Sequence, residues 1–271
     1  MCVGLSKLGF GPLPVLIALI FFVQSFFVYT IAVLKHDVDP IFPYLSSAAD
    51  KRPQSCIFAI GANISSVLLA LVVFVRYRQL RGIFAFYDEA NLQAWNWRQK
   101  WFGYIAALGL FFVANVQETA IIPVHMSSAV ASFGGFSIYM IFQCYLTHRV
   151  TPTITLRTVF YYRVIFTIFS VICFCCSFGF GIAASKIFHK TYPDLPTPRP
   201  WSRRIYQPGY ELHQISALAE WGCAISQIFF IQSFGPEFED ISLDYYLKSH
   251  YVPRGALEQE EYENEYQGYG I

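Results

Sequence analysis

The sequence predicts an all-α polytopic membrane protein, a six-helix transmembrane bundle with cytosolic termini. Two observations predict this fold: six long apolar segments fill most of the chain, and ionisable residues are concentrated at their ends. A helix of about 20 apolar residues spans the roughly 30 Å hydrocarbon core of a bilayer. Of the 271 residues, 55% are hydrophobic and 14% are charged, against about 25% charged in soluble domains. The composition therefore excludes a water-soluble core.

Each apolar segment is interpreted as one membrane-spanning helix. The first segment is too long for the apolar region of a signal peptide and lacks a cleavage site of small residues, so we expect it to remain as a helix. The third is the shortest, and tryptophans that suit a membrane interface precede it. The predicted spans are residues 10–34, 54–75, 101–117, 121–146, 164–185 and 212–233.

Two segments outside the spans differ from the rest of the chain. Residues 186–210 contain five prolines, which predicts an irregular connection. From Phe234 onward the chain carries nine acidic and two basic residues, a net charge of −7. We therefore predict two parts: a transmembrane domain over 1–234, and an acidic, Tyr-rich, disordered cytosolic tail over 235–271.

The orientation follows from the distribution of Lys and Arg. With a cytosolic N-terminus, eleven of the 19 basic residues lie on the cytosolic side and eight on the opposite side. Basic residues are enriched in the cytosolic loops of helical membrane proteins. This distribution favours cytosolic termini.

Polar residues within or near the spans predict a polar seam. Asn63 and Glu220 each lie nine residues inside a helix start, a depth of about 14 Å, and we expect the two side chains to meet there. Glu118 ends the third span, His125 opens the fourth, and His213 precedes Glu220 by two helical turns. A carboxylate at this depth should face the bundle interior. Helix–helix hydrogen bonding and direct function are both open for these residues.

A second predicted group, the luminal cluster, lies at the helix ends opposite the termini. Carboxylates near imidazoles could bind a metal, relay protons or act as general acid and base, although charged residues also collect at helix ends for solvation alone. The chain has no HExxH, GxSxG or Walker sequence, so we assign no catalytic residue, metal site or cofactor. The cluster comprises His36, Asp37, Asp39 and Glu211.

Several short segments, in order along nearly all of the membrane region, carry a family resemblance. The chain resembles the damage-regulated autophagy modulator (DRAM) family in these segments. They are Pro43-Tyr44-Leu45-Ser46, Pro53-Gln54-Ser55-Cys56-Ile57-Phe58, Asn63-Ile64-Ser65, Arg76-Tyr77-Arg78-Gln79, Asn115-Val116-Gln117-Glu118-Thr119 with His125, and His213-Gln214-Ile215-Ser216-Ala217 with Glu220-Trp221.

The resemblance implies six transmembrane helices with cytosolic termini, residence in endolysosomal or plasma membranes, and promotion of autophagy. The wider superfamily includes membrane proteins that remodel the lipids of GPI anchors. Ser46-Ser47-Ala48-Ala49 stands where the DRAM pattern has Ser-Asp-Thr-Gly, and this departure leans toward the lipid-remodelling relatives.

Three functions follow as hypotheses. The first is a non-enzymatic membrane regulator of autophagy and lysosomal function, in lysosomal or other endomembranes or alternatively in the plasma membrane. The second is a lipid-modifying or lipid-handling protein, and the third is a channel or transporter component. The expected partners are membrane lipids and cytosolic proteins that bind the C-terminal tail, and nucleic acid is not expected. The oligomeric state is left open.

Overall fold

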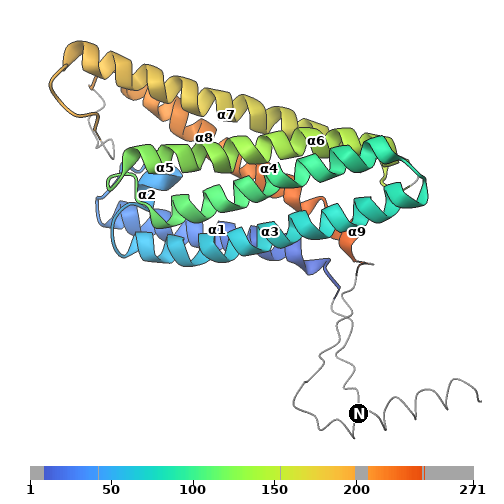
Figure 1. Ribbon diagram of the computed structural model, residues 1–271. Helices are drawn as coiled ribbons and strands as arrows, with labels where there is room; N and C mark the ends of the chain where they lie inside the picture. Colours follow the sequence, from blue (N-terminus) through green and yellow to red (C-terminus); the bar gives the residue numbers. More distant parts are fainter. Residues whose placement is uncertain (1–8, 42, 153, 199–206, 240, 242–271) are drawn as a thin grey trace, which may run out of the picture. The chain divides into compact units, whose positions relative to one another are not determined.

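The computed structural model describes residues 9–241 apart from 42, 153, 199–206 and 240. Throughout this part of the chain the regular structure is helical, so the predicted all-α polytopic membrane fold is confirmed. Of the tail predicted over 235–271, residues 242–271 lie outside the described residues. The helices (Figure 1) are α1 (Pro12–Leu34), α2 (Leu45–Ala48), α3 (Gln54–Phe86), α4 (Ala90–Asn115), α5 (Ile122–Ala129), a π-helical turn η1 (Val130–Gly134), α6 (Gly135–Val150), α7 (Arg157–Thr191), α8 (Tyr210–Gln232) and α9 (Gly235–Phe238).

Five helical segments of the described chain are long and apolar enough to cross a membrane. They are Pro12–Leu34, Gln54–Phe86, Ile122–Val150, Arg157–Thr191 and Tyr210–Phe238. The sixth long helix, α4, has 26 residues, but its first half is polar and includes Arg98 and Lys100. The count of six spans and the cytosolic position of the termini therefore stay predictions.

Helices α3 and α7 extend further than the apolar segments that predicted them. The second predicted span ended at residue 75, whereas α3 continues to Phe86, and a turn at 87–89 leads directly into α4. Likewise, α7 continues to Thr191, so the connection predicted as irregular from residue 186 begins six residues later. A helix does not end where its side chains become polar, because the hydrogen bonds that hold it are formed by the backbone.

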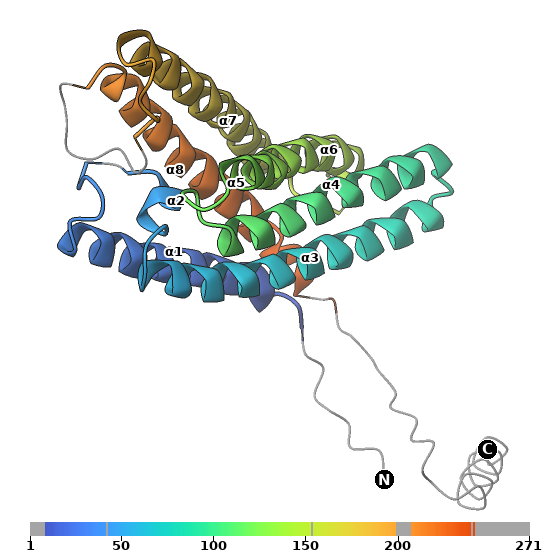
Figure 2. The same cartoon turned by 60° about the vertical axis from the view of Figure 1, so that its left-hand side comes forward.

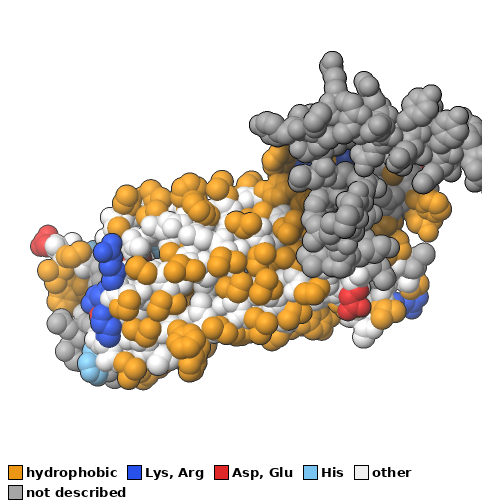
Figure 3. Space-filling view, turned by 90° about the horizontal axis from the view of Figure 1, so that it is seen from below, with side chains coloured by type: hydrophobic (Ala, Val, Ile, Leu, Met, Phe, Trp, Pro, Cys, Tyr) orange, Lys and Arg blue, Asp and Glu red, His pale blue; other side chains and the backbone are white. Residues whose placement is uncertain are grey.

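Pairs of long helices lie side by side, with α3 against α4 and α7 against α8 (Figures 1 and 2). The most apolar part of α7 is only 17% buried, whereas that of α8 is 56% buried. Helix α7 is therefore peripheral, and α8 is central. Figure 3 shows hydrophobic side chains along one face of the bundle, with charged side chains toward its ends. This distribution matches the apolar and interfacial layers of a bilayer.

The fourth predicted span is a single helical segment interrupted by the π-turn η1. Helix α4 approaches this turn closely at Gly109: a Cβ there would lie 2.5 Å from the Ser132 nitrogen and 2.8 Å from the Ser128 oxygen. Only glycine allows such an approach. Small residues at helix contacts are typical of membrane bundles.

The two ends of the described bundle lie next to each other. The Phe10 N–H donates to the Ile241 carbonyl at 3.2 Å, and α9 lies after residue 234, where we placed the start of the tail. Phe238 on α9 is fully buried. The boundary at 234 stays a prediction, but the first residues beyond it pack into the bundle.

Candidate functional site

Four of the five residues predicted to form the polar seam line one cavity of about 260 Å³, here called the polar cavity. Glu118 reaches it from the α4–α5 connection, His125 from α5, and His213 and Glu220 from α8. The structure thus brings together residues that are up to 102 positions apart in the sequence. Further polar residues in its wall are Tyr44, Ser46, Ser177, Ser185, Lys186 and Thr197.

Glu220 is held by the connection between α1 and α3. Its Oε2 accepts a hydrogen bond of 2.9 Å from the Leu45 backbone N–H at the start of α2. The neighbouring Trp221 donates from Nε1 to the Pro43 carbonyl at 2.8 Å. Two consecutive residues of α8 therefore hold the chain at the start of α2. The segments around Pro43 and around Glu220, which both carry the family resemblance, are in contact in the structure.

Glu118 and His125 are both buried and are held by short hydrogen bonds. Ser47 on α2 donates to Glu118 Oε2 at 2.8 Å, and His125 Nδ1 lies 2.7 Å from the Val116 carbonyl. This distance is that of a hydrogen bond in which the imidazole donates, because a carbonyl oxygen accepts only.

His213 lies against Tyr44, with the two rings edge to face at 4.8 Å between centroids. The Tyr44 hydroxyl is hydrogen-bonded to Ser216 Oγ, and Ser216 in turn donates to the Ser177 carbonyl of α7. His213 is 3% exposed. One side of the polar cavity is therefore a hydrogen-bonded contact between the α1–α3 connection, α8 and α7.

Asn63 lies elsewhere, so the predicted meeting of Asn63 and Glu220 does not occur. Asn63 and Asn115 exchange two side-chain hydrogen bonds, at 2.8 and 3.2 Å, between α3 and α4. Asn63 and Glu220 have the same estimated depth, but the neighbour of a side chain also depends on which way its helix face is turned. Asn63 acts in helix–helix packing.

The predicted luminal cluster is dispersed over separate contacts. His36 follows α1 in a left-handed conformation (φ 57°), and Asp37 accepts from Lys51 at 3.0 Å and from Gln54 at 2.6 Å. Buried Asp39 accepts from the Tyr210 hydroxyl at 2.6 Å, and Glu211 is exposed in the first turn of α8. Across the described chain, no three His, Cys, Asp or Glu residues are grouped as metal ligands.

The surroundings of Asp37 act on its pKa in opposite directions. Partial burial raises the pKa, but hydrogen bonds from Lys51 and Gln54, together with the charges of Lys51 and Lys35, lower it by more. The net effect holds the pKa below the ordinary value of 3.8. Asp37 is therefore ionised at neutral pH and fixes the end of α1 to the start of α3.

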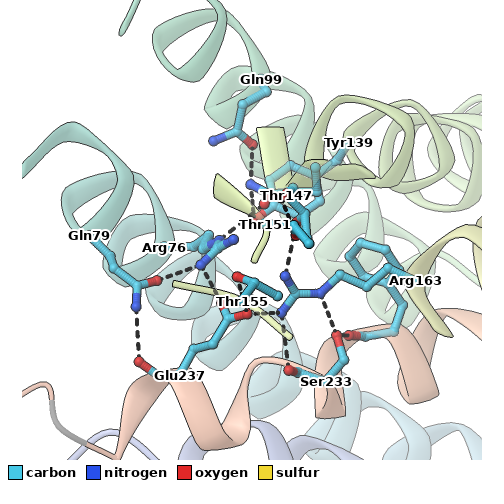
Figure 4. Close-up of polar contacts among 12 residues, drawn as sticks. Arg76, Gln79, Gln99, Tyr139, Thr147, Thr151, Thr155, Arg163, Ser233 and Glu237 are labelled. Carbon is cyan, nitrogen blue, oxygen red and sulfur yellow. Dashed lines mark hydrogen bonds and ion pairs between the residues drawn. The ribbon is translucent and has the colours of Figure 1, made fainter. Parts of the chain in front are cut away.

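A second polar group, which the sequence did not predict, lies at the opposite end of α8. We call Arg76, Arg163, Glu237 and Phe234 the arginine network, and Figure 4 shows its two arginines and Glu237. Both arginine side chains are fully buried and both pair with Glu237, through Oε2 for Arg76 and through Oε1 for Arg163 at 3.1 Å. The Phe234 ring lies 5.2 Å from the Arg76 guanidinium carbon and 4.5 Å from that of Arg163.

Neutral polar side chains complete the arginine network. Arg76 donates to Gln143 at 3.1 Å and to Gln79 at 2.6 Å, while Thr155 donates to Glu237 at 2.9 Å. Gln79 also donates to the Glu237 backbone carbonyl. Buried charges are tolerated only when they are paired and hydrogen-bonded in this way. The arginine network joins α3, α6, α7 and the α8–α9 segment.

The sequence places Arg76 and Arg163 among the basic residues of the predicted cytosolic loops, and Glu237 among the nine acidic residues that follow Phe234. Position did carry a signal: Arg76 follows directly on a long apolar segment, and Arg163 precedes another by one residue. Arginines at such positions are equally common as interfacial anchors. Their burial depends on α9, which is far away in the sequence and could not be placed by periodicity.

The polar cavity contains the groups that proton chemistry requires. Two carboxylates and two imidazoles line a space large enough for several water molecules. Carboxylate and imidazole can each gain or lose a proton near physiological pH when their surroundings shift the pKa. The arrangement can bind polar ligands and exchange protons, whereas the arginine network has its charges committed to one another.

Comparisons with known proteins identify the family. The family model "Frag1/DRAM/Sfk1/Cwh43P N-terminal domain" matches residues 9–241, which is the whole described bundle. The chain is 32% identical to DNA damage-regulated autophagy modulator protein 2 of Homo sapiens over 219 residues, covering 80% of this chain and 79% of that protein.

Other relatives carry similar names. Identity with DNA damage-regulated autophagy modulator protein 1 of Mus musculus is 26%, covering 79% of this chain and 85% of that protein. Identity with the modulator of macroautophagy TMEM150B of Danio rerio is 32%, over 52% and 59% of the two chains. No solved structure matches. The predicted resemblance is therefore confirmed, and the chain belongs to the Frag1/DRAM/Sfk1/Cwh43P family.

Proposed function

We propose that this protein is a multi-pass membrane modulator of autophagy. The observation that carries the proposal is the identity of about 30% with proteins named autophagy modulators, over 80% or more of the chain. The matched region runs to the end of α9, so it contains both the polar cavity and the arginine network. The shared unit is the bundle rather than the acidic tail.

The finer parts of the proposal concern place and mode of action. We place the protein in lysosomal or other endomembranes and assign it a non-enzymatic role, in which the bundle responds to its surroundings and the tail binds cytosolic partners. The polar cavity supports a responsive role because it has titratable groups that contact α2 through Leu45 and Ser47. A change of charge there acts directly on the α1–α3 connection.

Deletion and rescue of the gene tests the proposal. Cells without the protein should show reduced autophagic flux, measured as the accumulation of autophagosome cargo when lysosomal degradation is blocked. Wild-type protein, expressed at its native level, should restore the flux, and a tagged copy should co-purify with lysosomes or other endomembranes. Unchanged flux after deletion contradicts the proposed function, whereas residence only in the plasma membrane contradicts its endomembrane part alone.

A second candidate function is lipid handling, and one observation favours it. The wall of the polar cavity includes Ile182, which is 56% exposed on the peripheral helix α7, so the cavity borders the surface that faces lipid. A headgroup could enter between these elements while its acyl chains stay in the bilayer. The purified protein in liposomes of defined composition should then change the lipids present, and His213→Ala and His125→Ala should abolish that change.

A further inference from the structure

A second cavity, here called the apolar cavity, adjoins the polar cavity at Glu220. Its volume is about 90 Å³, and its walls are mainly aliphatic and aromatic side chains from α1, α3, α4, α6 and α8. Three residues line both cavities: Ser46, Phe133 and Glu220. Glu220 is therefore placed between a polar space and an apolar one, near the middle of the central helix α8.

Two buried polar atoms, each on a residue that lines the apolar cavity, have no hydrogen-bond partner among the described residues. They are Oε1 of Gln24 on α1, a residue 7% exposed, and Oγ of Ser65 on α3, a residue 5% exposed. Gln24 lies against Gly61, where a Cβ would be 2.0 Å from its Oε1. An unsatisfied buried polar group costs about 1–3 kcal/mol. These atoms need a hydrogen-bonding partner that the described part of the chain does not supply.

Water meets this requirement and an acyl chain does not. A buried water needs about 10–15 Å³ of accessible volume and two to four polar partners, so the apolar cavity has room for several. Gln24, Ser65 and Glu220 supply the partners. A hydrocarbon chain in the same space would leave the Gln24 and Ser65 oxygens unsatisfied.

The route to bulk water runs through the polar cavity. Its wall reaches exposed Lys186 near the end of α7 and Thr197 in the connection beyond α7. In the other direction, Ser233 of the arginine-network end lies 13 residues after Glu220, about 20 Å along a helix. There Arg76 and Arg163 are 0% exposed, and their positive charges oppose the passage of a cation.

We propose that water in the two cavities brings protons to Glu220 from the end of the bundle that carries α2, and from that end only. The titratable groups of the described chain that face this route are Tyr44 from the α1–α3 connection, Glu118 from the α4–α5 connection, His125 from α5, Lys186 from α7 and His213 from α8. Glu220 is the only titratable group among the described residues that line the apolar cavity.

The proton transfer has a direct structural consequence. A hydronium ion gives its proton to the Glu220 carboxylate: an O–H bond of the hydronium breaks, one forms on the carboxylate, and a water molecule remains. The hydrogen bond from the Leu45 N–H then ends on a neutral carboxyl group instead of an anion. Charge-assisted hydrogen bonds are roughly twice as strong as neutral ones. Protonation therefore loosens the hold of α8 on α2.

Difference infrared spectroscopy on the full chain in nanodiscs tests the route. Acidification should produce a protonated-carboxyl band that shifts in D₂O and is lost in Glu220→Gln. Where Glu220→Gln does not fold, Glu220→Asp should instead move the band to another frequency. A wild type without the band at any pH at which it stays folded overturns the proposal, as does a band that Glu220→Gln retains.

A pair of glycines on α7 supplies a matched test of the path. Gly181 lines the polar cavity, and a Cβ there would lie 3.1 Å from the Tyr44 hydroxyl and from Ser216 Oγ, whereas a Cβ at Gly179 would meet nothing within 4 Å. Gly181→Leu should slow the deuterium shift of the band severalfold, and Gly179→Leu should leave it at the wild-type rate. Equal rates in both variants overturn the path through the polar cavity.

Sidedness is tested in sealed vesicles whose orientation is known from the accessibility of a C-terminal tag. A pH jump on the side of α2 should produce the band within the time of mixing. A jump confined to the side of the arginine network should not produce it until the pH gradient across the membrane collapses. Prompt appearance of the band from that side overturns one-sided access.

Discussion

The two ends of the bundle use buried polar residues in opposite ways. At the arginine network, two cations share one carboxylate and stack on Phe234, and the side chains of both arginines are fully buried. At the polar cavity, two carboxylates and two imidazoles line a cavity, and their partners include the Leu45 N–H, the Ser47 hydroxyl and the Val116 carbonyl. Saturated charge holds helices together, whereas titratable groups beside an empty volume remain able to change state.

Loss of the shared carboxylate should have the largest effect on stability. Glu237→Ala leaves Arg76 and Arg163 buried without a counter-charge, and breaking a buried pair costs about 3–5 kcal/mol. We expect a clear fall in Tm and in the yield of folded protein. The neighbouring exposed Glu239 gives the control, since Glu239→Ala should leave Tm nearly unchanged. Wild-type stability of Glu237→Ala would show that the arginine network does not hold the bundle.

Removal of the aromatic ring isolates the cation–π part of the arginine network. Phe234 is 0% exposed and also stacks on Phe238, at 5.6 Å between centroids. Phe234→Leu keeps an apolar side chain but loses the ring face, and we expect a cost of about 2 kcal/mol, the upper range for desolvated cation–π contacts. Thermal unfolding of the purified protein measures it. The methionine side chain has nearly the volume of leucine and also lacks a ring face. Phe234→Met should therefore show the same loss as Phe234→Leu if the ring face is responsible.

At the polar cavity, loss of the Ser47 hydroxyl that binds Glu118 should lower the stability by a smaller amount. Ser47→Ala removes a buried hydrogen bond of 2.8 Å. Leaving a buried acceptor without its partner costs about 1–3 kcal/mol of stability. The expected value lies at the low end, because water in the polar cavity can replace the hydroxyl. Ser127→Ala on the exposed side of α5 is the control. A loss as large as that of Glu237→Ala would remove the contrast between the two ends.

The smallest expected effect depends on pH and concerns Asp37. Its pKa is lowered below 3.8, so its stabilising contribution is complete above pH 3.8 and is lost as the pH falls through the lowered value. Because Lys51 is 55% exposed, solvent screens the pair and the contribution is small. The Tm of wild type should exceed that of Asp37→Asn at pH 7, and the difference should vanish at strongly acid pH. A difference that grows on acidification contradicts the assignment.

The sequence predicted the fold class because the apolar segments required by a bilayer are local features. It also predicted that Glu118, His125, His213 and Glu220 would belong together, since helix order and approximate depth place them near one end. It did not predict where the helices end, because a polar segment such as that around Arg78 continues an α-helix beyond the membrane without a break.

Contacts between side chains could not be predicted in the same way. Asn63 was expected beside Glu220 but pairs with Asn115, since the rotation of α3 about its axis is set by packing against α4. The arginine network escaped prediction for a related reason. Glu237 lies in an acidic segment whose composition resembles a tail, and only the packing of α9 against the bundle shows that it is the counter-charge of two buried arginines.

We propose that the polar cavity carries the function and that the arginine network supports the fold, and Glu220→Gln tests this most directly. The amide keeps the size of the side chain and its ability to accept the Leu45 hydrogen bond, but it cannot bind a proton. In cells that lack the wild-type protein, Glu220→Gln should reach normal protein levels and normal location yet fail to restore autophagic flux. Full restoration of flux at normal protein level would contradict the claim.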